Sequence, residues 1–261
     1  MQNALLRHPT ALIHPDAQLH PTVFVGPYCI VGPQVRVGAH TRLHAHVVLE
    51  GPVELGENNQ LYPFCCLGQP AQVRGENMLS RVGGRLVVGD FNIIREYVTL
   101  HRGSEAGRGE TRLGSRCYLM VSSHVAHDCD VGDEVVMANG VSLAGHVEVA
   151  GQVTFGGLAG IHQGVRVGRL SMVAAGAMVS QDVPPFCLVQ GDRARLRGLN
   201  LVGLRRAGFS SECISGLKRL YRQHFLSRGG GSRSEAAAFP EGDELLEFVR
   251  RSHRGVCTSR V

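Results

Sequence analysis

The chain has 261 residues, a formal net charge of +5, 34 glycines, 5% aromatic residues and no tryptophan. This composition favours many tight turns around small aliphatic side chains over a large aromatic core. The charge is modest and no nucleic-acid reading motif accompanies it, so nucleic acid is not an expected partner. No run of about 18 to 20 apolar residues is present, so stable membrane insertion is not expected either.

The eight cysteines are expected to be reduced thiols and not a disulfide scaffold. The chain is long, begins Met1-Gln-Asn-Ala-Leu-Leu-Arg without the apolar core of a signal peptide, and has no Cys-x-x-Cys pair typical of metal sites. These features predict a cytoplasmic protein, and we expect neither a metal nor a cofactor.

The dominant pattern is an aliphatic residue at every sixth position. The first series runs in unbroken phase from Ile13 to Leu67, the phase resumes at Val82 or Val88 as far as Leu100, and a third series runs from Leu113 to Val179. The fourth residue after each of these anchors is usually small or branched. A period of six excludes an α-helical stripe and suits a short strand plus a turn, with both positions pointing inward. Because three such units close a triangular coil, we predict a mainly-β parallel helix of about eight coils, on the order of 40 Å long.

The six-residue phase breaks twice, after Leu67 and after Leu100. Each break adds residues beyond one repeat, which predicts protruding loops near residues 68–81 and 103–111. Loops on a rigid scaffold are frequent sites of function, so both are candidate parts of a binding site.

The repeat is expected to end after Val179, because the following Asp182-Val-Pro-Pro segment contains prolines that cannot continue a hydrogen-bonded ladder. Apolar residues then recur at helical spacing from about residue 205 to residue 226. Ser210 and Ser211 are available to cap this helix.

Three glycines at residues 229–231 predict a flexible link, and a second helix is predicted from about Gly242 to Arg251. We therefore divide the chain into a β-helix domain at residues 1–190 and a small C-terminal α-helical domain at residues 191–261. The helical domain is expected to cap the open end of the prism.

Five histidines of the later coils have spacings that stack them along one strip of the surface. They are His101, His124, His127, His146 and His162. His127 and His146 are 19 residues apart, about one coil, and His162 follows His124 by 38 residues, close to two coils.

His127 and Asp128 form a predicted acid–base pair. A neutral imidazole can take a proton from an attacking hydroxyl, and a neighbouring carboxylate fixes its tautomer and stabilises the imidazolium that forms. Acyl transfer also needs a donor for the carbonyl oxygen as it becomes an oxyanion, commonly a backbone N–H at a residue without a bulky side chain. Gly145 is the candidate for this role.

The repeat resembles that of the hexapeptide-repeat acyltransferases, which implies a left-handed coil and a homotrimer with active sites in grooves between neighbouring prisms. Within these enzymes the motifs look like those of the UDP-N-acetylglucosamine O-acyltransferases, over nearly the whole chain. The matching stretches are Ile94-Arg-Glu-Tyr-Val-Thr-Leu-His-Arg-Gly, His124-Val-Ala-His-Asp-Cys, Leu143-Ala-Gly-His-Val, Ile161-His-Gln, Gln181-Asp-Val-Pro-Pro and Asn200-Leu-Val-Gly-Leu-Arg-Arg. The resemblance implies transfer of a (3-hydroxy)acyl chain from acyl carrier protein to the 3-position of UDP-N-acetylglucosamine, the first step of lipid A synthesis.

The same resemblance implies that His127 is the general base, Asp128 its partner and Gly145 the oxyanion donor. The positions that match the substrate groove are His101, His124, His146, His162 and Gln163. The positions that match nucleotide contacts from a neighbouring subunit are Asn200 and Arg206. The positions that match the acyl-chain groove are Met172 and Ala175, and alanine in place of the common glycine predicts a shorter preferred chain.

The chain departs from the family pattern at positions that match contacts to the sugar nucleotide, which accepts the acyl chain. The first loop reads Gln69-Pro-Ala-Gln-Val-Arg-Gly where the family usually has Pro-Gln-Asp-x-Lys-Tyr, and two positions of the nucleotide site are Val202 and Ala207. A transferase of the same fold with a different amino or hydroxy sugar nucleotide is therefore the alternative function. More distant alternatives are a zinc enzyme of the γ-class carbonic anhydrase type, because clustered histidines can bind metal, and a scaffold without turnover.

Basic residues gather between Arg193 and Arg222. They predict a patch for an acidic partner, and the acyl carrier protein that the family uses as donor fits this description. A solvated helical face is the other interpretation that the sequence leaves open.

Overall fold

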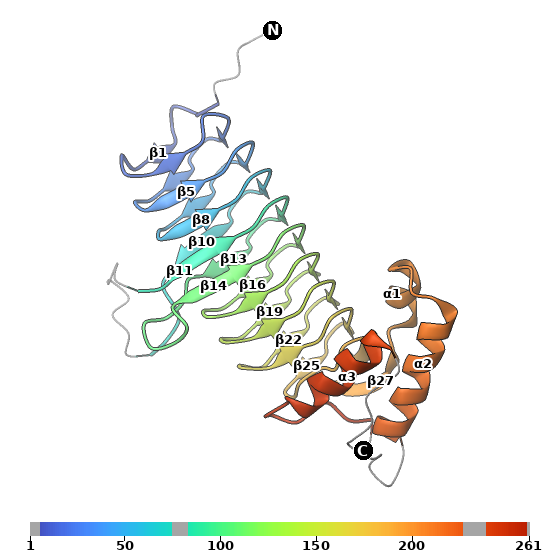
Figure 1. Ribbon diagram of the computed structural model, residues 1–261. Helices are drawn as coiled ribbons and strands as arrows, with labels where there is room; N and C mark the ends of the chain where they lie inside the picture. Colours follow the sequence, from blue (N-terminus) through green and yellow to red (C-terminus); the bar gives the residue numbers. More distant parts are fainter. Residues whose placement is uncertain (1–5, 75–82, 227–238, 260–261) are drawn as a thin grey trace.

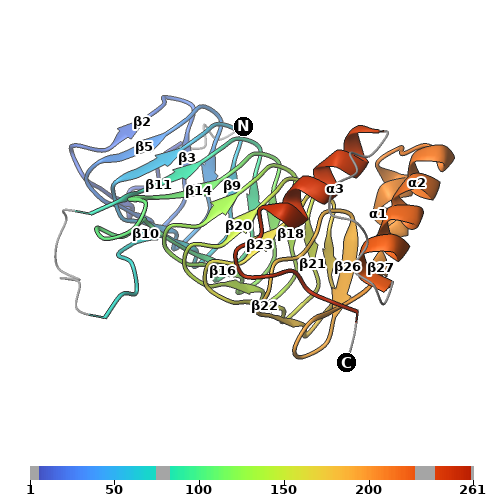
Figure 2. The same cartoon turned by 60° about the horizontal axis from the view of Figure 1, so that its bottom comes forward.

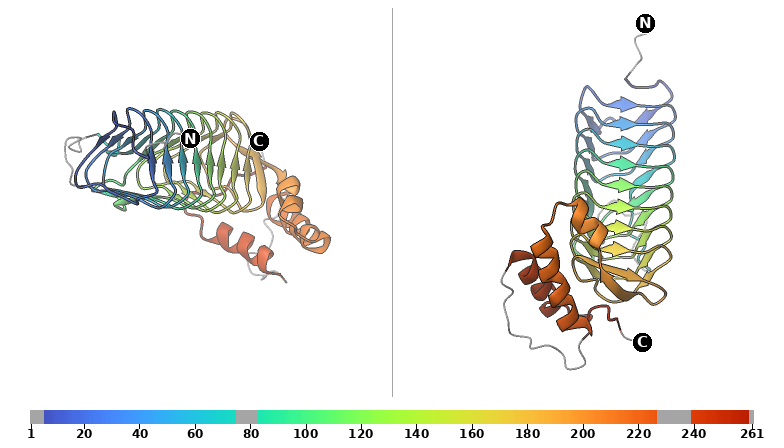
Figure 3. Two further views of the ribbon diagram at one scale, coloured as in Figure 1. Left: turned by 90° about the horizontal axis from the view of Figure 1, so that it is seen from above. Right: turned by 90° about the vertical axis from the view of Figure 1, so that its right-hand side faces the viewer.

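The computed structural model describes residues 6–74, 83–226 and 239–259. Their strands form a three-sided prism of stacked coils, and the helices lie at its carboxyl-terminal end (Figure 1). Seen from the side, the strands of one face stack as parallel rungs from the first coil to the last (Figure 3). This arrangement confirms the predicted parallel β-helix with a helical C-terminal part.

Each side of the prism is one sheet, and from β1 to β25 its neighbouring strands are three apart in chain order, as a three-sided coil requires. Face 1 consists of β1 (Leu12–Ile13), β4 (Ile30–Val31), β7 (Val48–Leu49), β10 (Cys66–Gln69), β13 (Thr99–His101), β16 (His124–Val125), β19 (Ser142–Leu143), β22 (Gly160–Ile161) and β25 (Met178–Val179). Face 2 consists of β2 (Gln18–Leu19), β5 (Val35–Val37), β8 (Val53–Leu55), β11 (Arg85–Val88), β14 (Glu110–Leu113), β17 (Asp130–Val131), β20 (Glu148–Val149) and β23 (Arg166–Val167). Face 3 consists of β3 (Phe24–Val25), β6 (Arg42–Leu43), β9 (Gln60–Leu61), β12 (Ile93–Ile94), β15 (Tyr118–Leu119), β18 (Val136–Met137), β21 (Thr154–Phe155), β24 (Met172–Val173), β26 (Cys187–Gln190) and β27 (Arg195–Leu199).

The anchors of the six-residue repeat fill the interior of the prism. Leu143, Ile161 and Val179 stack in register on successive coils, and each is at most 3% exposed. The fourth position after an anchor also points inward, which explains why these cysteines are buried: Cys29, Cys65, Cys117 and Cys129. The candidate anchor Val82 lies outside the described residues, and Val88 carries the phase. Burial of each large aliphatic side chain contributes about 1.5 to 3 kcal/mol.

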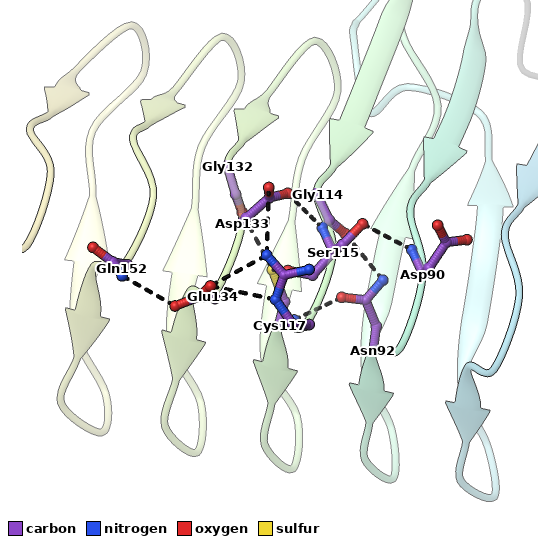
Figure 4. Close-up of polar contacts among 10 residues, drawn as sticks. Asp90, Asn92, Gly114, Ser115, Cys117, Gly132, Asp133, Glu134 and Gln152 are labelled. Carbon is purple, nitrogen blue, oxygen red and sulfur yellow. Dashed lines mark hydrogen bonds and ion pairs between the residues drawn. The ribbon is translucent and has the colours of Figure 1, made fainter. Parts of the chain in front are cut away.

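A polar ladder runs inside the corner between faces 2 and 3. The side-chain amide of Asn59 donates to the carbonyl of Gly89, and the N–H of Asn92 donates back to Oδ1 of Asn59, both at 2.9 Å. Asn92 repeats the pattern one coil on, donating to Gly114 at 3.0 Å and accepting from the N–H of Cys117 at 2.7 Å (Figure 4). Both asparagines are fully buried, so this ladder satisfies groups that water does not reach.

Both predicted insertions leave the corner between faces 1 and 2. The first connects β10 to β11, and its residues 75–82 lie outside the described residues. The second connects β13 to β14 through residues 102–109. The first predicted loop began too early, because Gly68 and Gln69 complete β10. The second ended too late, because Glu110 pairs with Arg85 at the start of β14.

The expectation that the repeat ends after Val179 is wrong. Pro184 and Pro185 lie at a corner, where no ladder N–H is required of them, and β26 then adds a parallel strand beside β24. β27 turns back and pairs with β26 in the antiparallel sense. The domain boundary predicted at residues 190 and 191 falls in the connection between these two paired strands.

The predicted helix over residues 205–226 is in fact interrupted. Helix α1 (Leu201–Arg206) ends before Gly208, whose φ of +80° stops the helix, and α2 (Ser211–Tyr221) continues into the π-helix η1 (Arg222–Leu226). Ser210 caps α2 by accepting the N–H of Cys213 at 3.2 Å, as predicted.

The second predicted helix is α3 (Pro240–Arg250), while the predicted glycine link at 229–231 lies outside the described residues. Gly216 of α2 lies so close to the Phe239 ring before α3 that a Cβ atom there would be 2.8 Å from it. Helices α1 and α2 lie beside β26 and β27 at the end of the prism (Figure 2), while α3 contacts β23, where Arg166 lies over the Phe248 ring. Across the described ranges, no helix has the length and apolar character to cross a bilayer.

Candidate active site

A cleft of about 650 Å³ lies on face 1 and its corner with face 2, in the carboxyl-terminal half of the prism. Three successive coils supply most of its wall, through β16, β19 and β22 and the turns that follow them. Five of the predicted site residues line it: His124, His127, Gly145, His162 and Gln163. The repeat itself brings them together, because residues about eighteen apart stack on neighbouring coils.

His127 and Asp128 occupy the turn between β16 and β17. Nδ1 of His127 lies 2.8 Å from Oδ2 of Asp128, whose side chain is wholly buried. Asp128 has a φ of +60°, a left-handed conformation that aspartate tolerates better than most residues. Its backbone N–H donates to Oγ1 of Thr111 at 2.7 Å, which ties the turn to β14.

The Asp128 carboxylate is ionised although it is buried. Burial raises its pKa, but hydrogen bonds from Ser104 and His127 outweigh this, and the net effect is a pKa below the usual aspartate value. An ionised carboxylate only accepts hydrogen bonds, so Nδ1 of His127 carries the proton. This assignment leaves Nε2 of His127 with its lone pair free to act as a base.

Gly145 lies against the His127 ring. A Cβ atom at residue 145 would be 2.7 Å from Cε1 and 2.8 Å from Nε2 of His127, so only glycine fits under this imidazole. Its own N–H finds no acceptor in the described part of the chain. A free N–H beside a base is the arrangement that an oxyanion donor needs.

Two further predicted histidines surround the pair. His146 packs edge-on to His127 with ring centroids 5.1 Å apart, and its Nε2 is 3.8 Å from Oδ2 of Asp128. His124 bonds to Oγ1 of Thr99 at 2.8 Å through Nδ1, and burial followed by the nearby His127 lowers its pKa. Both rings are therefore oriented by contacts of their own.

His101 lies behind His124 and does not line the cleft. Its ring meets that of His124 edge-on at 5.1 Å, and it is only 7% exposed. Burial, followed by the charge of His124, lowers its pKa to about 4. Among the described residues its Nδ1 has no hydrogen-bond partner.

His162 receives a contact that the sequence did not reveal. Nη2 of Arg254 lies 3.1 Å from Nδ1 of His162, although the two residues are 92 positions apart. Two hydrogen bonds to Asp182 hold the C-terminal segment against the prism here. The hydroxyl of Ser252 donates to the Asp182 carboxylate at 2.8 Å, and the N–H of Cys257 donates to the backbone carbonyl of Asp182 at 2.8 Å.

Four predicted residues are not brought to the cleft within one chain. Asn200 caps α1 by accepting the N–H of Gly203 at 3.0 Å, and its amide donates to the carbonyl of Leu170. Arg206 is exposed at the end of α1. Met172 lies on the outer side of face 3, and Ala175 is exposed at the corner between faces 3 and 1.

Several residues at the site were not predicted from the sequence to belong to it. Ser104 and Gly109, from the second insertion, donate to the Asp128 carboxylate, and Gln72, from the first insertion, lines the cleft. Arg193, from the β26–β27 connection, closes its far end. The two breaks of the repeat were the signal that these loops matter, but spacing alone does not indicate which loop residue reaches the site.

One cluster has donor atoms of the kinds that bind metal ions. The donor atoms of His127, Asp128 and His146 lie within 4.8 Å of one another. However, Oδ2 of Asp128 already accepts a hydroxyl at 2.6 Å and an imidazole N–H at 2.8 Å. The geometry is that of a hydrogen-bonded base, which a metal would have to displace.

The chain matches two family models. Residues 182–257 match domain 2 of the UDP N-acetylglucosamine O-acyltransferases, and residues 16–51 match the bacterial transferase hexapeptide repeat. Among curated proteins, the acyl-[acyl-carrier-protein]--UDP-N-acetylglucosamine O-acyltransferase of Verminephrobacter eiseniae is 45% identical over 67% of this chain, and the alignment spans 66% of that relative. The enzyme of the same name from Anaeromyxobacter sp. strain K is 42% identical over 72% of this chain and 73% of the relative.

Solved structures of similar proteins superpose on nearly the whole chain. The UDP-N-acetylglucosamine O-acyltransferase from Moraxella catarrhalis superposes with a TM-score of 0.91 at 37% identity, over 97% of this chain and 99% of that one. The relative from Acinetobacter baumannii has the same TM-score and coverage at 38% identity. These likenesses confirm the left-handed parallel β-helix. The chain therefore belongs to the UDP-N-acetylglucosamine O-acyltransferase family.

Proposed function

We propose that the protein transfers a (3-hydroxy)acyl chain from the thioester of acyl carrier protein to the 3-hydroxyl of UDP-N-acetylglucosamine. The observation that carries this proposal is the His127–Asp128 pair, whose free Nε2 faces the cleft beside the N–H of Gly145. Relatives that share the whole fold bear the name of this activity. The reaction needs no cofactor, because a base and an oxyanion donor suffice.

His127 acts as the general base. Its Nε2 takes the proton of the sugar hydroxyl as that oxygen attacks the thioester carbonyl, and Asp128 stabilises the imidazolium. The carbonyl oxygen becomes an oxyanion and accepts the N–H of Gly145. The tetrahedral intermediate then expels the thiolate of the carrier, which takes the proton back from Nε2, so that the enzyme returns to its starting state.

The polar residues of the cleft are the proposed substrate contacts. His124, His162 and Gln163 line the cleft directly, and His146 supports His127 from the side. His101 contributes by holding His124 from behind. Gln72 occupies part of the first insertion, where the family's acceptor contacts differ in this chain, so another amino or hydroxy sugar nucleotide remains the alternative acceptor.

The character of the three faces supports the proposal of a homotrimer. The outward residues of face 2 are mostly polar or charged, as in the pairs Arg36–Glu54 and Arg166–Glu148. The outward side chains of face 1 are instead apolar in its first strands, and Leu12 is 66% exposed. Such a face is typical of one covered by another subunit.

The edge shared by faces 1 and 3 carries stacked rings in successive coils: Tyr28, His46, Phe64 and Tyr97. We propose that this edge turns toward the trimer axis and that face 3 of one subunit meets face 1 of the next. Met172 and Ala175 then approach the neighbour's cleft as the acyl-chain groove, and Asn200 and Arg206 reach it as nucleotide contacts.

The donor protein binds at the basic C-terminal part. Arg193 lines the cleft, and Arg219 and Arg222 are exposed on α2 and η1. An acidic carrier protein suits this charge. A cytoplasmic location would give the enzyme access to both soluble substrates.

A mass-spectrometric screen tests the proposal. Acyl carrier proteins of different chain length are offered with UDP-N-acetylglucosamine and with other UDP-sugars, with and without a chelator. We expect an O-acylated UDP-N-acetylglucosamine whose formation survives chelation, from a protein that sediments as a trimer. Turnover of another sugar alone would select the alternative acceptor, and activity that depends on zinc would select a metal enzyme.

A further inference from the structure

The Asp128 carboxylate receives all but one of its hydrogen bonds from the loop between β13 and β14. The hydroxyl of Ser104 donates to Oδ2 at 2.6 Å, and the N–H of Ser104 lies 3.2 Å from both carboxylate oxygens. The N–H of Gly109 donates to Oδ1 at 3.0 Å. The remaining donor is Nδ1 of His127, at 2.8 Å from Oδ2.

The loop is shaped around this carboxylate. Gly107 passes so near that a Cβ atom there would collide with Oδ2 of Asp128. Ser104 is 3% exposed and the Asp128 side chain has no exposed surface, so neither group is solvated. Because a buried carboxylate without donors would be neutral, the loop is what allows it to stay charged.

We propose that Ser104 is a positioning residue for acyl transfer: its hydroxyl holds the Asp128 carboxylate charged and aimed at Nδ1 of His127. This inference rests on the proposed function of the cleft. It makes the second insertion part of the catalytic machinery, although no residue of that loop needs to touch a substrate.

Ser104 acts on the base through a shared atom. Its hydroxyl and the His127 ring both donate to Oδ2 of Asp128, so the hydroxyl draws off part of the negative charge that stabilises the imidazolium. When the hydroxyl is lost, the N–H groups of Ser104 and Gly109 and the His127 ring still donate to the carboxylate and keep it ionised. More of its negative charge is then left for His127, which favours the protonated ring. The rising limb of the rate against pH therefore moves to higher pH in Ser104→Ala, while poorer orientation lowers the maximal rate.

Other charged or titratable groups near the pair come from every neighbouring element. They are His146 on the next coil, His124 and His101 on face 1, the Cys129 thiol, and the Arg108–Asp130 ion pair at 3.2 Å. The Ser104→Ala change removes none of them. A shift of the pH profile in that variant therefore reports the Oδ2 contact.

The test is a double-mutant cycle of Ser104→Ala with Asp128→Asn, together with Ser104→Thr. We expect Ser104→Ala to lower kcat about 10-fold and to shift the rising limb to higher pH, and Ser104→Thr to restore both. In the Asp128→Asn background Ser104→Ala should add almost nothing, because its partner charge is gone. Ser115→Ala is the matched control, since that hydroxyl only accepts the N–H of Asp90 at 3.0 Å on another corner (Figure 4).

Two results would overturn the inference. One is a Ser104→Ala enzyme with the rate and pH profile of the wild type, and the other is the same fractional loss with and without Asp128, which would mean that Ser104 only stabilises its loop. If Ser104→Ala does not assemble, Ser104→Cys carries the same test with a weaker donor. If the wild type transfers no acyl group, the proposed function fails, and the imidazole titration of His127 by NMR in wild type and variant still decides the role of Ser104.

Discussion

Replacement of Gly145 by alanine should displace the His127 ring, although it removes no group that takes part in the reaction. The φ of Gly145 lies outside the left-handed region, so alanine fits the backbone, and the cost comes from space alone. The new Cβ would start 2.7 Å from Cε1 of His127, and ordinary contact requires a shift of about 0.7 Å. The ring is held by a 2.8 Å bond to Asp128, which such a shift stretches beyond hydrogen-bonding range.

We expect kcat to fall about 10²-fold, because a displacement approaching 1 Å in a catalytic group has an effect of that size. The free energy of unfolding should fall by about 1 to 3 kcal/mol from the overpacking. Steady-state transfer with a saturating UDP-sugar measures the first effect and denaturant unfolding the second. Gly151→Ala is the control, since the nearest atom to its Cβ would be the carbonyl oxygen of Asp133 at 3.2 Å, far from His127. Near-normal turnover in a folded Gly145→Ala enzyme would refute the placement of His127 as the base.

Three further outcomes are expected. His127→Ala should lower turnover by roughly 10² to 10⁴-fold and abolish the rise of rate with pH in the imidazole range, while nucleotide binding measured by calorimetry is largely kept. His101 stays neutral in the fold down to about pH 4, whereas the unfolded chain takes up a proton below about pH 6.5. Stability should therefore drop by up to about 3 kcal/mol as the pH falls through this window, and His101→Gln should flatten the slope of unfolding free energy against pH. Arg219→Glu with Arg222→Glu should weaken the affinity for acyl carrier protein and reduce its dependence on salt, and unchanged binding in a folded variant would leave that surface as a solvated face.

Most of the fold could be read from the six-residue period, because each anchor has to point into the same narrow core. The handedness could not, since the general preference in parallel connections is the opposite one, and only the resemblance supplied it. The prolines after Asp182 misled the prediction of where the repeat ends. A proline interrupts a ladder only at a position where a backbone N–H has to donate, and Pro184 and Pro185 lie at a corner.

The candidate site was likewise predicted only in part from the sequence. His127 and Asp128 are adjacent in the sequence, and Gly145 is one coil away, so the periodicity places all three together. Ser104 reaches the site through a loop whose path no periodicity describes, and Arg254 reaches it through a segment that leaves the prism and returns. Residues outside the repeat therefore have to be located by structure.

The asparagine ladder has a consequence for the two insertions. Asn59 precedes the first insertion, Asn92 lies between the two, and Cys117 follows the second, so each detour of the chain is bracketed by amides that join the coils on either side of it. The cost of closing a longer loop grows only slowly with its length. The stack can therefore admit loops of new length and composition at the corner between faces 1 and 2 while the amides at the corner between faces 2 and 3 keep the coils aligned, so that loops beside the cleft can vary without a change in the scaffold.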